Sequence, residues 1–200
     1  MMTRKPARTR LSPDDRRAQL VTNAVACFAD HGIARATQAQ VAQRAGVSVS
    51  AVYFYFRTRA DLVDAVLESV AETIVAMVGD AVAAPGSPAE VLAALATRTA
   101  EMAVAEPDSV RVWLDWSTGV RADVWPRFLV LQRRLQGLVE SVLVRGGDPV
   151  AGPAITSAAR LFVGGAHTLA LMRFENVGEA ELGIFIDQMV GGVVAVLPKA

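Results

Sequence analysis

Hydroxyl-bearing side chains are concentrated in one short stretch near the start of the chain, between residues 48 and 55. They belong to Ser48, Ser50, Tyr53 and Tyr55, with Ala51 and Phe54 between them. Hydroxyl groups in this pattern can donate hydrogen bonds to phosphate oxygens, and residues at the start of a helix can reach base edges in the major groove of DNA. The chemistry that this stretch predicts is recognition of a duplex.

Three side chains that flank this stretch are also predicted to contact DNA: Thr37, Gln38 and Arg59. Thr37 starts a predicted helix, where its backbone N–H can bind a phosphate, and Arg59 can grip a phosphate on the opposite flank. Two alternatives stay open. Tyr53 and Phe56 are also candidates for core aromatics, and Tyr55 suits either a phosphate contact or packing.

A basic arm precedes the first predicted helix. Residues 1–60 contain ten Lys or Arg and three Asp or Glu, whereas the rest of the chain contains ten and seventeen. The net charge of zero therefore combines a basic head, which suits a polyanion, with an acidic body. Within the arm, Arg8 and Arg10 are predicted to enter a narrow minor groove; the alternative is a solvated basic tail.

Helical spacing and capping residues position these side chains. A first helix is predicted over residues 13–30, a second over 38–45 and a third over about 49–54. Each follows a Ser or Thr that is a good N-cap. The second and third are joined by a tight turn at residues 45–48, which is the arrangement of a helix-turn-helix.

Helical periodicity continues through the rest of the chain, and no strand alternation is found. Further helices are predicted at about residues 59–82, 88–104, 123–144, 152–174 and 179–197, with one more around Trp113 that ends near Gly119. The predicted fold class is all-α with about nine helices. It comprises a DNA-binding domain at residues 1–58, with the basic arm and the helix-turn-helix, and a helical domain at residues 59–200.

Composition and motifs exclude several classes of protein. With 52% hydrophobic residues the chain is not expected to be disordered, and its single cysteine, Cys27, rules out a disulfide framework and a cysteine zinc cluster. No H-E-x-x-H, P-loop or G-x-S-x-G motif occurs, so we expect no enzyme activity, cofactor or metal site. No signal core or membrane-spanning apolar run occurs, and we expect a soluble, cytoplasmic protein.

The N-terminal sequence resembles the DNA-binding head of TetR-type regulators. The matching residues are Phe28, Gly32, Thr37, Val41, Ala42, the turn Ala45-Gly46-Val47-Ser48, Tyr53, Phe56, Arg59 and Leu62. The resemblance implies a regulator of transcription that places its helix-turn-helix in the major groove of double-stranded operator DNA.

Segments outside the head resemble the LuxR/HapR type within this family, the quorum-sensing master regulators of vibrios. They include VRVWLDWSTGVRADVWPRF and RFENVGEAEL. This resemblance implies a homodimer that represses or activates many genes. The vibrio pattern has asparagine where Phe54 stands and threonine where Ala51 stands; Phe54 can instead contact a thymine methyl group.

TetR-type bodies usually enclose an apolar pocket, and the resemblance implies one here for a small apolar ligand. Its lining would be Ile74, Met77, Val78, Leu95, Trp113, Phe128, Gln132, Gln136, Phe162 and Ala166. Apolar walls with a few amides suit such a ligand, although the same side chains at helical spacing also suit an ordinary core. A ligand-responsive local repressor of efflux or metabolism genes is therefore the alternative function.

The last two predicted helices indicate a dimer interface. Gly164 and Gly165 allow close helix approach, and an apolar stripe follows at Leu182, Phe185, Ile186, Met189, Val190 and Val193. Two helices from each subunit would form a four-helix interface that sets two recognition helices about one DNA turn apart. The alternative is a stripe that packs within its own subunit. A helical scaffold without a role at DNA is the remaining class of function.

Overall fold

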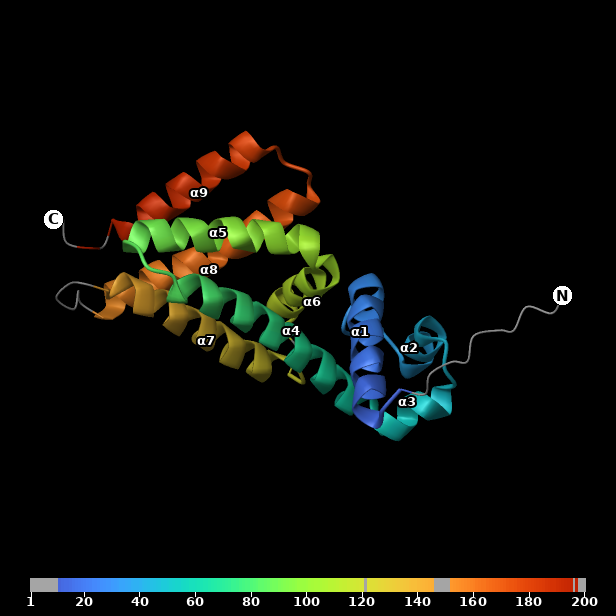
Figure 1. The fold of residues 1–200 in the computed structure, drawn as a ribbon. Coiled ribbons are helices and arrows are strands. Elements are labelled where there is room, and N and C mark those ends of the chain that lie inside the picture. Colours follow the sequence, from blue (N-terminus) through green and yellow to red (C-terminus); the bar gives the residue numbers. More distant parts are fainter. Residues whose placement is uncertain (1–10, 121, 146–151, 196, 198–200) are drawn as a thin grey trace. The chain divides into compact units, whose positions relative to one another are not determined.

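The structure, a computed structural model, describes residues 11–120, 122–145, 152–195 and 197, and within these ranges it consists of nine α-helices and their connections (Figure 1). These described residues include no β-strand, which agrees with the predicted all-α fold. The chain divides into two compact units, residues 1–69 and residues 70–200, and the boundary falls inside the long helix α4 (Arg59–Ala83). None of the described helices is long and apolar enough to cross a membrane.

The N-terminal unit contains three helices and the first part of α4. The three are α1 (Pro13–His31), α2 (Gln38–Ala45) and α3 (Val49–Tyr55). Each begins after a hydroxyl side chain that accepts a hydrogen bond from a backbone N–H three residues later, which satisfies a donor that the helix leaves unpaired. Helix α2 packs against both α1 and α3 around a core that includes Leu20, Phe28, Val41, Val52, Phe56 and Leu62.

The C-terminal unit contains the second part of α4 and five further helices. They are α5 (Pro88–Ala105), α6 (Pro107–Thr118), α7 (Trp125–Leu143), α8 (Gly152–Phe174) and α9 (Glu179–Val194). Helix α8 is central to the packing because it contacts α5, α7 and α9, and α9 runs back along it in the opposite direction (Figure 1). Small buried side chains such as Ala158, Ala159 and Ala170 let these helices approach α8 closely.

The connection between α6 and α7 is fixed by a buried tryptophan. The Trp116 side chain is 2% exposed, and its Nε1 donates a hydrogen bond to the carbonyl oxygen of Val124 at 3.0 Å. A buried indole N–H needs such a partner. Helix α7 accordingly begins at Trp125, two residues after the start that the sequence pattern predicts.

Candidate nucleic-acid interface and interior cavity

The turn between α2 and α3 is held by local hydrogen bonds. Gly46 has a left-handed backbone with φ of 64°, and its N–H donates to the carbonyl oxygen of Gln43 at 3.2 Å. This conformation favours glycine because a side chain would be strained there. Ser48 then caps α3 by accepting a hydrogen bond from the N–H of Ala51 at 3.2 Å. The turn therefore leads directly from one helix into the next.

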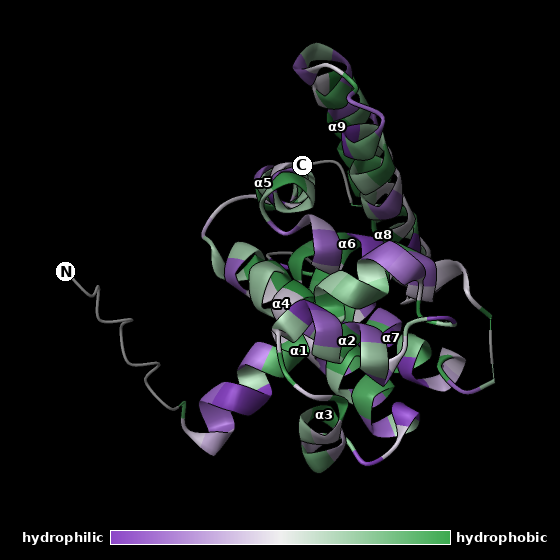
Figure 2. Cartoon of the chain, turned by 90° about the vertical axis from the view of Figure 1, so that its right-hand side faces the viewer, coloured by the Kyte–Doolittle hydropathy of each residue, from purple (hydrophilic) through white to green (hydrophobic). Residues whose placement is uncertain are grey.

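The outer face of α3 brings together four of the side chains predicted to contact DNA: Ser48, Ser50, Tyr53 and Phe54 are exposed. Phe54 is 77% exposed and Tyr53 is 49% exposed, so neither is a core residue. Ala51 and Tyr55 are half-buried. Phe56, by contrast, is 1% exposed and belongs to the core. Figure 2 shows α3 in pale and green colours, which marks it as largely apolar.

Gln38 and Arg59 have a supporting position instead of an exposed one. Gln38 is 6% exposed, and its Nε2 donates to the carbonyl oxygen of Phe56 at 2.6 Å. The Arg59 guanidinium donates to the carbonyl oxygens of Ala36, at 3.1 Å, and Ile33. Carbonyls without a helical partner need donors, and these two side chains supply them. Both therefore hold the connections of the N-terminal unit together.

Other predicted contacts lie at the edges of this surface or outside the described residues. Thr37 is exposed at the start of α2, where its N–H is bonded to Gln40 Oε1 at 2.8 Å. Arg8 and Arg10 lie outside the described residues. The sequence pattern missed two exposed side chains at the ends of α3, namely Val49, which is its first residue, and Arg57, which follows its last turn. Val49 lies four residues before Tyr53 and therefore on the same face of the helix, and this spacing could have indicated that Val49 belongs to the exposed surface.

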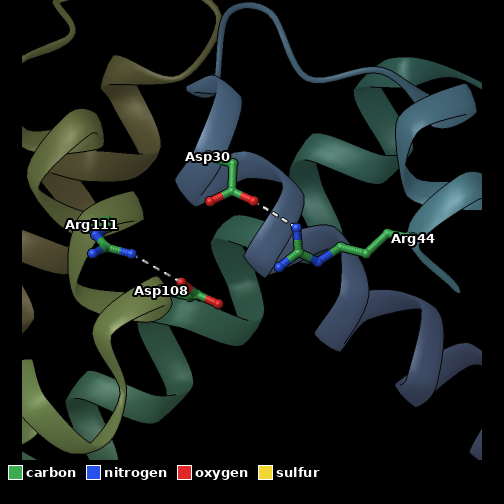
Figure 3. Close-up of polar contacts among 4 residues, drawn as sticks. All are labelled: Asp30, Arg44, Asp108 and Arg111. Carbon is green, nitrogen blue, oxygen red and sulfur yellow. Dashed lines mark hydrogen bonds and ion pairs between the residues drawn. The ribbon is translucent and has the colours of Figure 1, made fainter.

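An ion pair links α1 to α2 in the N-terminal unit. Arg44 Nη1 lies 2.6 Å from Asp30 Oδ2, and both side chains are roughly half exposed (Figure 3). An exposed pair of this kind contributes at most about 1 kcal/mol to stability. Figure 3 also shows a looser pair within α6 of the other unit, between Arg111 and Asp108 at 3.5 Å. Because Arg44 is paired, its charge is less available to a phosphate than that of Arg57.

The C-terminal unit encloses a small apolar cavity of about 30 Å³ between α4, α5, α6, α7 and α8. Seven of the residues predicted to line a pocket surround it: Ile74, Met77, Val78, Leu95, Trp113, Phe162 and Ala166. This volume exceeds the roughly 10–15 Å³ that a water molecule needs, but ligand pockets are usually about 300–1,000 Å³. A ligand of ordinary size would therefore require the lining side chains to move.

The other three predicted lining residues lie elsewhere. Phe128 and Gln132 line a separate surface hollow of about 580 Å³, together with Trp125 and His167. Gln136 is buried and belongs to the lining of neither the cavity nor this hollow. Phe128 and Gln132, four residues apart, share the face of α7 that lines the hollow, whereas Leu135 and Val139 are the residues of α7 that line the cavity.

Two aromatic rings separate the cavity from the hollow. The rings of Trp113 and His167 stack with their centroids 4.0 Å apart, and His167 Nδ1 lies 2.8 Å from the carbonyl oxygen of Val163. Trp113 Nε1 and His167 Nε2 are buried without a hydrogen-bond partner. Burial lowers the pKa of His167 below its ordinary value, and the hydrogen bond to Val163 opposes this effect. His167 is therefore neutral near pH 7.

Comparison with known proteins supplies the family. The profile described as bacterial regulatory proteins, tetR family, matches residues 20–66, which include α2 and α3. The chain is 33% identical over 181 residues to the HTH-type transcriptional regulator LuxR of Vibrio harveyi, and the match covers 89% of this chain and 88% of that protein. The chain belongs to the TetR family. It is accordingly a DNA-binding transcriptional regulator with an N-terminal helix-turn-helix, and not an enzyme.

Solved structures of TetR-type regulators share the fold of this TetR-family chain. A TetR-like transcriptional regulator from Rhodococcus sp. RHA1 superposes with a TM-score of 0.76 at 19% identity, covering 93% of this chain and 99% of that one. FadR from Bacillus subtilis in complex with stearoyl-CoA superposes with a TM-score of 0.73 at 14% identity, covering 90% and 99%. At these identities the likeness concerns the fold alone.

The predicted dimer residues of this TetR-family chain divide between its core and its surface. Leu182, Met189, Val190 and Val193 are buried within the subunit, Gly165, Phe185 and Ile186 are half-buried, and Gly164 is exposed. A Cβ atom added to Gly165 would collide with the Met189 sulfur, so this glycine serves the close packing of α8 on α9 inside one chain. Large exposed apolar side chains on the same two helices are Leu161, Leu171 and Ile184.

The stability of this TetR-family protein is expected to fall as the pH is lowered through 6.5, the ordinary pKa of histidine. The unfolded chain binds a proton at His167 near that pH, whereas the folded site, with its lowered pKa, resists protonation, so the unfolded state is favoured by acid. Urea unfolding between about pH 7.5 and 5.5 measures this dependence. The His167→Gln variant, which lacks the titrating imidazole, should show a flatter profile than the wild type, and an equally steep profile would contradict the prediction.

Proposed function

We propose that this TetR-family chain is a homodimeric regulator of the quorum-sensing type, which binds operator DNA through α3 and controls many genes. The observation that carries the proposal is the exposed face of α3, which follows a tight turn and presents Ser48, Ser50, Tyr53 and Phe54. Similarity to LuxR over 89% of the chain, well beyond the helix-turn-helix, supports the finer assignment. Action on the chromosome would place the protein in the cytoplasm.

The dimensions of α3 suit the major groove. An α-helix with its side chains is about 10–12 Å wide, and the major groove of B-DNA is about 12 Å wide. In this arrangement the hydroxyls of Ser50 and Tyr53, the N–H groups near Thr37 and the Arg57 guanidinium would contact phosphates, and Arg8 and Arg10 would enter the minor groove. We assign residues 1–58 to DNA binding and residues 59–200 to dimerisation and regulation.

Selection of bound fragments from genomic DNA tests this function directly. The purified protein should retain a small set of duplexes that share a two-fold symmetric sequence, with half-sites about one helical turn apart. Affinity for these duplexes should fall steeply as the salt concentration rises, because phosphate contacts release counterions. If no duplex is retained even in dilute salt, the proposal is wrong. Genes beside the selected sites should change in expression with cell density when the quorum-sensing assignment holds.

Substitution of Arg8 and Arg10 by alanine together is expected to weaken operator binding by about tenfold and to lower its salt dependence by about four contacts per dimer, two from each subunit. The reason is that arginines on an arm can enter the minor groove of A·T-rich DNA. Fluorescence anisotropy with the selected operator at several salt concentrations measures both effects. The matched control is Arg133→Ala with Arg134→Ala, which removes the same charge from the exposed side of α7. Equal behaviour of the two variants would contradict the minor-groove arm.

A ligand-responsive local repressor is the second candidate, and the cavity beneath Trp113 favours it. Its walls are almost entirely apolar, and it has no Lys or Arg in its lining, so an apolar molecule suits it better than an anion. FadR from Bacillus subtilis, which shares this fold, was solved in complex with stearoyl-CoA, a ligand with a long apolar acyl chain and an anionic CoA group. A ligand acts on DNA binding only when it prefers one of two conformations. An apolar compound that changes the protein's Tm and its operator affinity together would support this candidate.

A further inference from the structure

The helix that the proposed function places in the major groove lacks the side chains that usually read bases by hydrogen bonds. Arg or Lys reads guanine, Asn or Gln reads adenine, and Asp or Glu reads cytosine. None of these six residue types occurs between Ser48 and Tyr55. The serine hydroxyls pair with each other, since Ser48 Oγ and Ser50 Oγ lie 2.9 Å apart, and a hydroxyl can bond to any base. Discrimination by α3 therefore requires another kind of contact.

Phe54 is the large apolar side chain that this helix leaves most open to solvent. It is 77% exposed, whereas Val52 and Phe56 on the opposite face are 0% and 1% exposed. Helical spacing places Phe54 on the same face as Ser50, four residues earlier, and next to Tyr53. The Phe54 ring therefore contributes little to the core of its own subunit. The ring is available to a partner surface.

The orientation of the Phe54 ring is supported from one side. The rings of Phe54 and Tyr55 meet edge to face, with centroids 5.1 Å apart and planes at 83°. Such a pair is a favourable aromatic geometry, and phenylalanine has only two side-chain torsions to restrict. A partner that packs against Phe54 would thus order few additional degrees of freedom. This preorganisation favours recognition by shape.

The C5-methyl group of thymine is the apolar group that base edges present in the major groove. An exposed phenylalanine on a helix without base-reading polar groups matches it in chemistry. We propose that Phe54 is a specificity-determining residue that selects operators by packing against thymine methyl groups. This inference rests on the proposed function, since it requires α3 to occupy the major groove. Val49, which is 42% exposed at the start of α3, lies on the neighbouring face with Tyr53, four residues later, and is a second exposed apolar side chain of this helix.

Removal of single methyl groups from the DNA tests the inference. Each thymine of a selected operator is replaced in turn by uracil, which differs from thymine only by that methyl group. Wild-type protein should lose about threefold to tenfold in affinity at one or two positions per half-site, as expected when a methyl-sized contact of about 0.8 kcal/mol or somewhat more is lost. The same replacements should not change the operator affinity of the Phe54→Ala variant. In the Phe54→Leu variant they should still cause part of the loss of affinity seen with wild-type protein.

The outcomes separate this inference from the function on which it rests. If wild-type protein binds no duplex, the proposed function fails. If it binds an operator but no uracil replacement weakens binding, or if Phe54→Ala is as sensitive to uracil as wild type, the assignment to Phe54 is overturned while the function stands. The inference is supported if the Phe54→Ala variant is no longer weakened by uracil at the positions that affect wild-type protein. The Val49→Ala variant should instead lose its sensitivity to uracil at a different base position. Circular dichroism confirms that each variant is folded.

Discussion

A Phe56→Ala substitution is expected to lower the free energy of unfolding by about 3–5 kcal/mol, the usual cost of truncating a buried phenylalanine. The Phe56 ring is 1% exposed and lies under the Arg17 guanidinium, 5.5 Å from its centroid. Its carbonyl oxygen accepts the hydrogen bond from Gln38 at 2.6 Å. Loss of the ring empties the core at the end of α3 and loosens this bond, so the helix-turn-helix should unfold at much lower urea concentration.

The matched control is Phe54→Ala, which removes the same side chain two positions earlier. Because Phe54 is 77% exposed, its loss should change the free energy of unfolding by no more than about 0.5 kcal/mol. Urea unfolding followed by circular dichroism compares the two variants, and operator binding is measured where both remain folded. Phe54→Ala should bind DNA with altered sequence preference although its stability is unchanged. Equal destabilisation by the two substitutions would show that the exposed position of Phe54 is incorrect.

Conversion of Leu161 and Ile184 to glutamate is expected to turn the proposed homodimer into a monomer. Leu161 on α8 is 56% exposed and Ile184 on α9 is 58% exposed, and both lie on the helix pair that packs together with Leu161 beside Gly192 of α9. Four carboxylates at a two-fold axis would repel each other and would lose their hydration if buried. Operator affinity should fall by about 10²–10⁴-fold, because two linked half-sites bind far more tightly than one.

Analytical ultracentrifugation and anisotropy with the selected operator measure both effects. The control is Val130→Glu, which places one carboxylate on the exposed side of α7 at a residue that is 58% exposed. This control should remain a dimer with unchanged operator affinity. A dimer that persists in the Leu161 and Ile184 variant would move the interface to another face of the subunit.

Features that depend on neighbours within about four residues could be read from the order of residues alone. Ser12, Thr37 and Ser48 were expected as N-caps, and each accepts the expected backbone hydrogen bond. Gly46 in the tight turn has the left-handed backbone for which glycine is suited. Such local interactions are encoded by spacing and residue type, and together with the family resemblance they were sufficient to predict an all-helical regulator with an N-terminal helix-turn-helix.

Positions that depend on distant partners could not be predicted in this way. Gln38 bonds to a carbonyl 18 residues later, and Arg59 bonds to carbonyls 23 and 26 residues earlier. Both side chains were expected at the DNA surface, since they are polar and flank the predicted helix-turn-helix. The sequence does not indicate which distant carbonyl oxygens the folded chain leaves without a helical partner. The cavity is similar, since its lining comes from five helices whose mutual rotation is not encoded in any one of them.

The apolar stripe of α9 shows the division most clearly. Periodicity alone indicated that one face of this helix is apolar and must be covered. It could not indicate that Leu182 and Met189 are buried within the same subunit while Ile184 is exposed. A helix of the same subunit and a helix of a partner subunit would both present apolar side chains, so the pattern suits either. Local order of residues thus specifies which elements form and, to within about three residues, where they begin and end. Which surface covers an apolar face is decided by how the helices pack, since burial is non-directional and only the assembled fold determines the contacts.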